Sequence, residues 1–296
     1  MWRWLPVVFL FVVPLPRAAT QTIYTQSRLV LVPVAVTDEK GATVSGLDRA
    51  KFTVFEDKVP QPIVAFSAED APSSVGLILD ASGSMRDRLN VAKAALRKFA
   101  DSANPADEAF LFTVSDRPGT SSAFTSDLDA LVERVRFTNG GGATALIDTV
   151  IAGLQRMRSA ANQRRALLIL SDGMDNHSRH SKSELIRLAT EAEVQVYTIR
   201  IVSPVRTKKA IEQQEEQRGL ALLRDLAEHT GGLHFEASDR EEADRVIAKA
   251  VMALRNEYVL AYHPARTDQP GKWHRIRVKL NVAHMNVSAR NGYYAE

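Results

Sequence analysis

The alternation of short apolar runs with longer amphipathic stretches between residues 75 and 255 limits the possible folds more than any other feature of the chain. The short runs are apolar at successive positions, as strands buried on both faces of a parallel sheet are. The longer stretches carry apolar residues three or four positions apart, as amphipathic helices do. The predicted strands are residues 75–79, 109–114, 166–170, 194–199 and 233–235, and the predicted helices are residues 89–100, 145–158, 183–192, 220–229 and 240–255. Strand followed by helix, repeated, predicts a doubly wound, mostly parallel α/β sheet.

The two flanks of this segment have a different pattern. Residues 29–36, 52–55 and 63–66 are predicted strands, with Pro33 indicating an edge strand or a bulge because proline cannot donate to a ladder. Near the other end, HRIRVKLNV alternates apolar and polar residues, which is typical of a strand with one buried face. Each flank alone is marginal for an independent core, so we expect residues 24–70 and 257–296 to form one small β-sandwich around an inserted domain at residues 74–254. The alternative is that both flanks merely decorate the α/β domain.

Residues 1–20 have the features of a secretory signal peptide. They combine a cationic start at Arg3, a short apolar run and small residues at Ala18 and Ala19. The run is too short and too rich in proline for a stable membrane span, although a retained anchor is the alternative. Cysteine is absent, which excludes disulfides and thiolate chemistry, and the net charge of +3 gives no reason to expect nucleic-acid binding. We therefore expect a bacterial protein that is secreted or periplasmic.

Candidate functional residues occur where predicted strands end. In ILDASGSM, Asp80 ends an apolar run and is followed by Ser82 and Ser84; Thr144 lies in NGGGATAL, and Asp172 follows ALLILS. The carboxyl ends of parallel strands form the usual ligand-binding edge of such a sheet. Two carboxylates and three hydroxyls are hard oxygen donors, which suit Mg²⁺, Mn²⁺ or Ca²⁺ rather than zinc or copper. With at most two negative charges around it, a divalent ion would stay electrophilic and could accept an acidic side chain from another molecule.

DASGS resembles the D-x-S-x-S motif of the metal ion-dependent adhesion site (MIDAS) in von Willebrand factor type A (VWFA) domains. Thr144 and Asp172 occupy the places of the threonine and the aspartate that complete this site in the family, and the resemblance covers residues 74–254. It implies that Ser82, Ser84 and Thr144 contact the ion directly, while Asp80 and Asp172 act directly or through water. The flanks resemble those of exported VWFA-related proteins of Acidobacteria, except that Lys58 stands where such proteins often have glycine in a turn.

Several alternatives remain open at this point. Asp80 and Thr144 could be helix caps and Asp172 an ordinary turn residue, while Asp175 and Asn176 could belong either to the rim of the site or to the turn alone. A serine hydrolase is disfavoured because the sequence lacks G-x-S-x-G. A Mg²⁺-dependent phosphohydrolase with Asp80 as nucleophile is the alternative function, and a scaffold whose site serves only folding is a third. The favoured function is a non-enzymatic module that binds a divalent cation, Mg²⁺ or else Mn²⁺ or Ca²⁺, and captures an Asp or Glu of a protein partner; the oligomeric state is left open.

Overall fold

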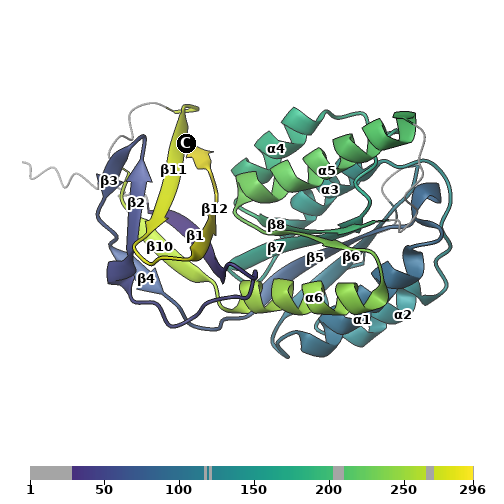
Figure 1. Cartoon of the computed structure of the whole chain (residues 1–296), viewed down its shortest axis with the longest axis horizontal. Coiled ribbons are helices and arrows are strands. Elements are labelled where there is room, and N and C mark those ends of the chain that lie inside the picture. Colours follow the sequence, from purple (N-terminus) through teal and green to yellow (C-terminus); the bar gives the residue numbers. More distant parts are fainter. Residues whose placement is uncertain (1–28, 117–118, 120–121, 203–209, 265–269, 296) are drawn as a thin grey trace, which may run out of the picture.

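A computed structural model describes residues 29–116, 119, 122–202, 210–264 and 270–295. The predicted signal peptide, residues 1–20, lies outside these ranges. Within them the chain forms an α/β part and a part made of two antiparallel sheets (Figure 1). None of the helices in these ranges is long and apolar enough to cross a membrane.

The α/β part is built on a five-stranded sheet in the order β6-β5-β7-β8-β9, and every neighbouring pair is parallel. β5 lies beside both β6 and β7, with Leu77 opposite Leu111 on one side and Leu168 on the other. All of its residues are buried, as expected for a strand covered on both faces. The predicted parallel sheet is therefore confirmed. Its strands are β5 (Ser73–Asp80), β6 (Glu108–Val114), β7 (Arg164–Ser171), β8 (Gln195–Ile201) and β9 (His234–Ala237).

Helices cover both faces of this sheet (Figure 1). α1 (Leu89–Ser102), α2 (Leu128–Arg136) and α6 (Arg240–Arg255) pack on one face, and α3 (Leu146–Met157), α4 (Lys182–Glu191) and α5 (Ala210–Thr230) pack on the other. The sequence analysis did not predict α2, which has nine residues and begins with Asp127 accepting a hydrogen bond from the Ala130 amide at 3.0 Å. α5 begins ten residues before the predicted start at residue 220, because its first turns continue the helix along an exposed polar stretch.

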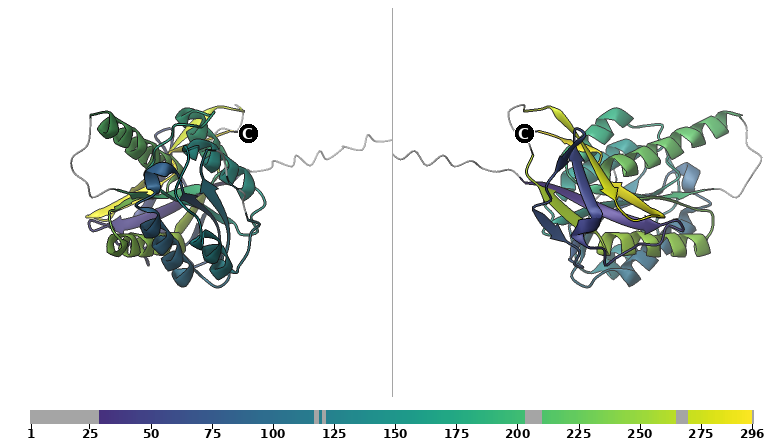
Figure 2. Two further views of the ribbon diagram at one scale, coloured as in Figure 1. Left: turned by 90° about the vertical axis from the view of Figure 1, so that its right-hand side faces the viewer. Right: turned by 60° about the vertical axis from the view of Figure 1, so that its left-hand side comes forward.

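The other part consists of two four-stranded antiparallel sheets, ordered β12-β1-β10-β4 and β13-β11-β2-β3. Each sheet combines strands from both ends of the chain, and Figure 2 shows these purple and yellow strands side by side. Buried residues from both sheets, including Val32, Val54 and Tyr262, form one apolar core. The predicted fold, an α/β sheet inserted in a small β-sandwich, is thus confirmed. The strands are β1 (Val30–Asp38), β2 (Phe52–Glu56), β3 (Val59–Gln61), β4 (Ala65–Ser67), β10 (Tyr258–Tyr262), β11 (Trp273–Leu280), β12 (Met285–Ala289) and β13 (Gly292–Tyr294).

Two details of these sheets explain unusual residues. β1 pairs with β10 through Val30–Val34 and with β12 only from Val34 onward, so the side of Pro33 away from β10 has no partner strand. The position of Pro33 is therefore a local edge within a strand that is otherwise central. Lys58 has a φ of +73°, next to Asp57 at +48°, in the tight turn between β2 and β3. Such two-residue hairpin turns favour glycine or asparagine, so Lys58 adopts its backbone conformation at some energetic cost.

The two parts meet at the amino-terminal edge of the parallel sheet. Arg164, the first residue of β7, donates to the backbone carbonyls of Glu69, Arg255 and Glu257, which lie on both chain crossings between the parts. Burial raises the pKa of the Glu257 side chain to about 8, although the positive charge of Arg164 acts in the opposite direction. This junction lies at the end of the sheet opposite Asp80.

Candidate functional site

The first loop of the candidate site follows β5. Asp80 is the last residue of that strand, and its Oδ1 accepts a hydrogen bond from the Ser82 amide at 2.9 Å. The turn brings the hydroxyls of Ser82 and Ser84 within 3.1 Å of each other. Asp80 and Ser82 are fully buried, whereas Ser84 is partly exposed. The structure therefore gathers the three polar residues of the D-x-S-x-S motif at one strand end, with Ser84 toward solvent.

The Asp80 carboxylate lies in an environment that disfavours its charged form. Its Oδ2 accepts a hydrogen bond from Ser171, the last residue of the neighbouring strand β7, at 2.5 Å. Burial and the nearby charge of Asp172 together raise the pKa of Asp80 to about 6, against the opposing effect of the hydrogen bonds from Ser171 and Ser82. Two carboxylates that repel each other in a buried place would be stabilised by a cation between or beside them. Ser171 was not among the predicted site residues.

Asp172 lies in the loop that follows β7, and it is 3% exposed. Its Oδ1 accepts a hydrogen bond from the Met174 amide at 3.0 Å, and its Oδ2 forms an ion pair with Arg88 at 2.8 Å. The same guanidinium donates to the backbone carbonyl of Ser84 at 2.5 Å, which links Asp172 to the serine loop. Arg88 was also absent from the predicted site.

The glycine-rich loop contributes Thr144, which is 2% exposed. Two backbone hydrogen bonds join this loop to the serine loop: the Gly83 amide donates to the Gly142 carbonyl at 3.1 Å, and the Gly141 amide donates to the Ala81 carbonyl at 2.9 Å. A Cβ at Gly140 would lie 2.8 Å from the Cα of Arg86, which accounts for glycine at this close approach. The backbone thus holds the Thr144 loop directly against the loop of Ser82 and Ser84.

The two predicted rim residues connect the remaining loops. Asn176 accepts a hydrogen bond from the Thr144 amide at 2.9 Å, and the Thr144 carbonyl accepts from the amides of Asn176 and His177 at 3.0 Å each. Asp175 accepts from the Ile147 amide at 2.7 Å and so satisfies an amide of the first turn of α3. Asn176 thus ties the loop of Asp172 to that of Thr144, whereas Asp175 ties it to the first turn of α3 and accepts from the hydroxyl of Ser178.

The helix-cap alternatives are wrong for Asp80 and Thr144. α1 begins at Leu89 with Arg88 at its N-cap and no side-chain cap, eight residues after Asp80. α3 has Ala145 at its N-cap, also without a side-chain cap. Asp172 does accept the amide two residues ahead, as a turn aspartate would, but its other oxygen faces Arg88.

The donor set fits a hard divalent cation. Across the described ranges, no three His, Cys, Asp or Glu side chains are grouped so that they could hold a metal ion. The candidate set contains only two carboxylates, and its other donors are hydroxyls, which oxygen-preferring ions such as Mg²⁺ accept. Ser82, Ser84 and Thr144 could hold such an ion, with Asp80 and Asp172 supplying charge.

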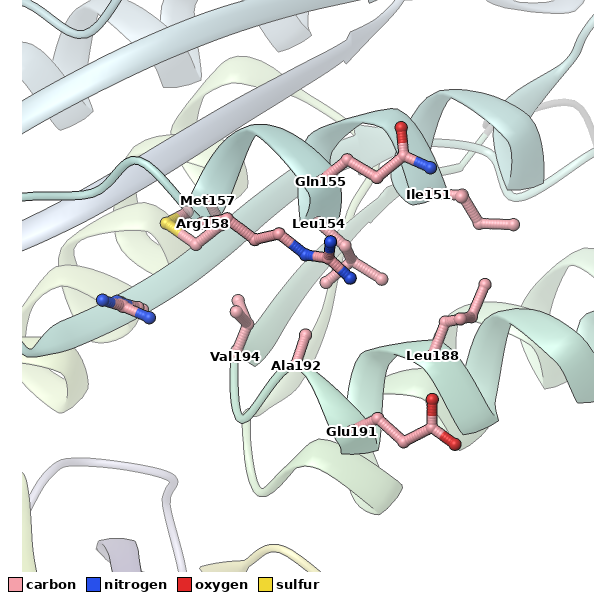
Figure 3. Close-up of a pocket in the computed structure, with 10 residues that line it drawn as sticks. Ile151, Leu154, Gln155, Met157, Arg158, Leu188, Glu191, Ala192 and Val194 are labelled. Atoms are coloured by element: carbon pink, nitrogen blue, oxygen red, sulfur yellow. The ribbon is translucent and has the colours of Figure 1, made fainter. Parts of the chain in front are cut away.

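Of two surface hollows formed by the described residues, one lies beside the site and the other lies away from it. One adjoins the site, because the segment Gly173–Asn176 that follows Asp172 lines it together with Ile147 and Leu222. The other lies between α3 and α4 and shares no residue with the site; Figure 3 shows its apolar side chains, among them Ile151 and Leu188, with Arg158 and Glu191 beside them. Only the first is placed to contact a molecule that is bound at the site.

Comparison with known proteins agrees with this architecture. Residues 75–174 match the family described as von Willebrand factor type A domain. Proximal thread matrix protein 1 from the mussel byssus has a similar structure, with a TM-score of 0.50 and 16% identity over 68% of this chain and 51% of that one. The conserved hypothetical protein BatB from Bacteroides thetaiotaomicron gives a TM-score of 0.48 and 16% identity over 62% of this chain and 98% of its own. The structure of von Willebrand factor type A from Catenulispora acidiphila gives a TM-score of 0.48 and 13% identity over 90% of this chain and 74% of its own.

No curated protein matches the sequence. At 16% identity, the likeness to the byssus protein indicates the fold alone. The sequence match covers β5, β6 and β7 and includes Asp80, Ser82, Ser84, Thr144 and Asp172. Residues 75–174 thus match the von Willebrand factor type A domain family, and the parallel five-stranded sheet with helices on both faces agrees with that match.

Proposed function

We propose that this protein is a non-enzymatic binding module that holds a divalent cation, Mg²⁺ or else Mn²⁺ or Ca²⁺, and through it captures an Asp or Glu side chain of a protein partner. The observation that carries the proposal is the gathering of Asp80, Ser82 and Ser84 at the carboxyl end of a central strand, with Asp172 linked to the same loop through Arg88. In this proposal Ser82, Ser84 and Thr144 hold the ion. Asp80 and Asp172 supply the negative charge.

The balance of charges supports capture of an acid rather than permanent storage of a cation. A calcium cage commonly uses several carboxylates, whereas this set has two, one of which already pairs with Arg88. A bound ion would supply a Lewis-acidic position that attracts a carboxylate. Ser84 is the most exposed of the three hydroxyl residues, so the partner would approach from its side. The adjoining hollow beside Met174 and Leu222 would then contact the residues that flank the partner's acid.

The contacts of Asp80 argue against the alternative of a phosphohydrolase. A carboxylate nucleophile needs an oxygen atom that can reach a phosphorus atom. Both oxygens of Asp80 accept hydrogen bonds within the protein, and the residue is fully buried. Its surroundings therefore favour a structural and electrostatic role.

We further propose that the protein acts outside the cytoplasm, in the periplasm or after secretion. This rests on the signal-peptide pattern of residues 1–20. Its direct check is amino-terminal sequencing of the mature protein, which would begin near residue 20 if the leader is removed. A mature protein that begins at Met1 would contradict removal of the leader.

The metal proposal is tested by titrating the purified protein, stripped with EDTA, with Mg²⁺, Mn²⁺ and Ca²⁺ in a calorimeter and in thermal unfolding. One of these ions is expected to raise the melting temperature, since at 100 times its Kd a ligand stabilises the folded state by about 2.7 kcal/mol. Ser84→Ala removes one hydroxyl of the cluster and is expected to weaken the binding of that ion. Ser159→Ala is the matched control, because this exposed hydroxyl only donates to a carbonyl of its own helix end.

Capture of an acid is tested with capped aspartate as the probe and capped asparagine as its neutral control. Capped aspartate is expected to bind only when the ion is present, and chelator is expected to release it. An ion that binds without any preference for the acid would contradict the adhesion proposal and leave a role in folding alone. Absence of any ion effect would refute the proposal altogether.

A further inference from the structure

Arg88 connects two loops of the candidate site to the end of a third strand. Its side chain is 15% exposed, and its guanidinium donates to Asp172 Oδ2 at 2.8 Å, to the Ser84 carbonyl at 2.5 Å and to the Ile201 carbonyl at 2.8 Å. Asp172 and Ser84 lie in the loops after β7 and β5, and Ile201 is the last residue of β8. A planar guanidinium can serve several acceptors in fixed directions, which an ammonium group cannot do equally well.

The ion pair changes the charge that the site offers to a cation. Asp172 is 3% exposed, and both of its oxygens are engaged, one by Arg88 and the other by the Met174 amide. A carboxylate in this state has little remaining capacity to bind an ion directly. Asp80 is then the one carboxylate of the predicted set whose charge is not neutralised by a cationic side chain in the described part of the chain.

We propose that Arg88 is a positioning residue that neutralises Asp172, holds it away from direct metal contact, and leaves the site one negative charge short until a partner supplies a carboxylate. This inference rests on the proposed function and deepens it. Ion and acidic ligand then bind cooperatively, because the ligand's charge replaces the one that Arg88 cancels. The protein binds its ion weakly alone and more tightly with an acid.

Electrostatics determines whether replacement of Arg88 should raise or lower the affinity for the metal ion. A guanidinium close to a divalent ion repels it, and in a water-like dielectric a unit charge acting on a divalent ion a few ångströms away changes a binding constant on the order of tenfold. Removing the charge of Arg88 is therefore expected to strengthen metal binding, although it removes hydrogen bonds. If Arg88 had a purely structural role, its replacement would have the opposite effect, because loosened loops would bind the ion less tightly.

The experiment measures Mn²⁺ affinity by calorimetry, with and without capped aspartate, for the wild-type protein and for variants at position 88. Arg88→Gln can keep one hydrogen bond to Asp172, whereas Arg88→Met only fills the space. The neutral variant that unfolds cooperatively in EDTA, and is therefore folded without the ion, is used to test the role of the Arg88 charge. Arg88→Lys keeps the charge. Arg97→Gln is the matched control, because it removes a partly exposed positive charge from the same helix.

The neutral variants are expected to bind Mn²⁺ about tenfold more tightly than wild type in the absence of acid, and to gain less from capped aspartate. Arg88→Lys is expected to stay nearer to wild type, and Arg97→Gln to match it. Unchanged or weaker Mn²⁺ binding by the folded neutral variants would overturn the role of Arg88 while leaving the proposed function intact. Failure of the wild-type protein to bind any ion would instead refute the proposed function, and this inference with it.

Discussion

Replacement of Asp80 by asparagine should stabilise the metal-free protein at neutral pH. The pKa of Asp80 rises from its ordinary value of 3.8 to about 6 because the group is buried and because Asp172 lies close by. One pKa unit corresponds to about 1.4 kcal/mol, so the charged form costs the metal-free folded state about 3 kcal/mol once the pH exceeds 6. Asparagine avoids this cost but loses the hydrogen bond from Ser171, which is worth about 1 kcal/mol. The expected net gain at pH 7.5 is about 2 kcal/mol.

The pH dependence has a defined sign. Between pH 4 and pH 6 the folded state holds the Asp80 proton more tightly than the unfolded state, so this group lowers wild-type stability as the pH rises through that window. The advantage of Asp80→Asn over wild type should therefore grow by about 2 kcal/mol between pH 4.5 and pH 7.5. Urea unfolding in EDTA at the two pH values measures it. Asp87→Asn, at an exposed position of the same loop, is the control and should show no such growth.

Addition of the ion should reverse the ranking of the two proteins. The wild-type protein gains stability from binding, whereas Asp80→Asn has lost a charge that the ion needs. An advantage of Asp80→Asn that is equal at both pH values, or a variant less stable than wild type at pH 7.5 in EDTA, would refute the reasoning about Asp80.

Three other substitutions test other parts of the structure. Burial raises the pKa of Glu257 to about 8, so the stability of Glu257→Gln relative to wild type should improve by about 4 kcal/mol between pH 5 and pH 8.5 in urea unfolding; a constant difference would contradict it. Gly173→Ala should destabilise the protein by about 2 to 4 kcal/mol and weaken ion binding, because φ is +83° and the new Cβ would lie 2.4 Å from a backbone oxygen of α5. Gly141→Ala is the control and should cost under about 1 kcal/mol, because nothing lies within 4 Å of its Cβ. Equal losses of stability in the two variants would contradict this reasoning. Tyr262→Phe should cost about 1 to 3 kcal/mol in thermal unfolding, since its hydroxyl donates to the buried carboxylate of Glu56 at 2.7 Å, and an unchanged melting temperature would show that this bond is dispensable.

The strand and helix rhythm was predictable because each element carries its own local pattern. β5 carries an uninterrupted run without polar side chains from Val75 to Leu79, and the helices predicted over residues 145–158 and 240–255 coincide closely with α3 and α6. α2 was missed because its nine residues provide only two turns of periodicity between polar loops. The polar stretch at residues 206–219 indicated a solvated helix and loop, but the start of α5 at Ala210 could not be located, because its first turns are exposed and polar and no apolar face marks them.

The candidate site was predictable only in part. Asp80, Ser82 and Ser84 are neighbours in the chain, and their closeness follows from one turn. Arg88 and Ser171 gave no comparable signal. Ser171 hydrogen-bonds a residue 91 positions away, and Arg88 bonds one 84 positions and another 113 positions away, so these contacts depend on how the parallel strands align. The ligand set itself stays a prediction.

A crystal structure with Mn²⁺, with data collected at a wavelength where manganese scatters anomalously, tests the central claim most directly. We predict one strong anomalous peak within about 2.2 Å of the hydroxyl oxygens of Ser82 and Ser84, with Thr144 on the same ion and Arg88 still paired with Asp172. A peak elsewhere on the molecule, or none at a Mn²⁺ concentration that saturates the calorimetric signal, would contradict the claim that these residues form a metal site.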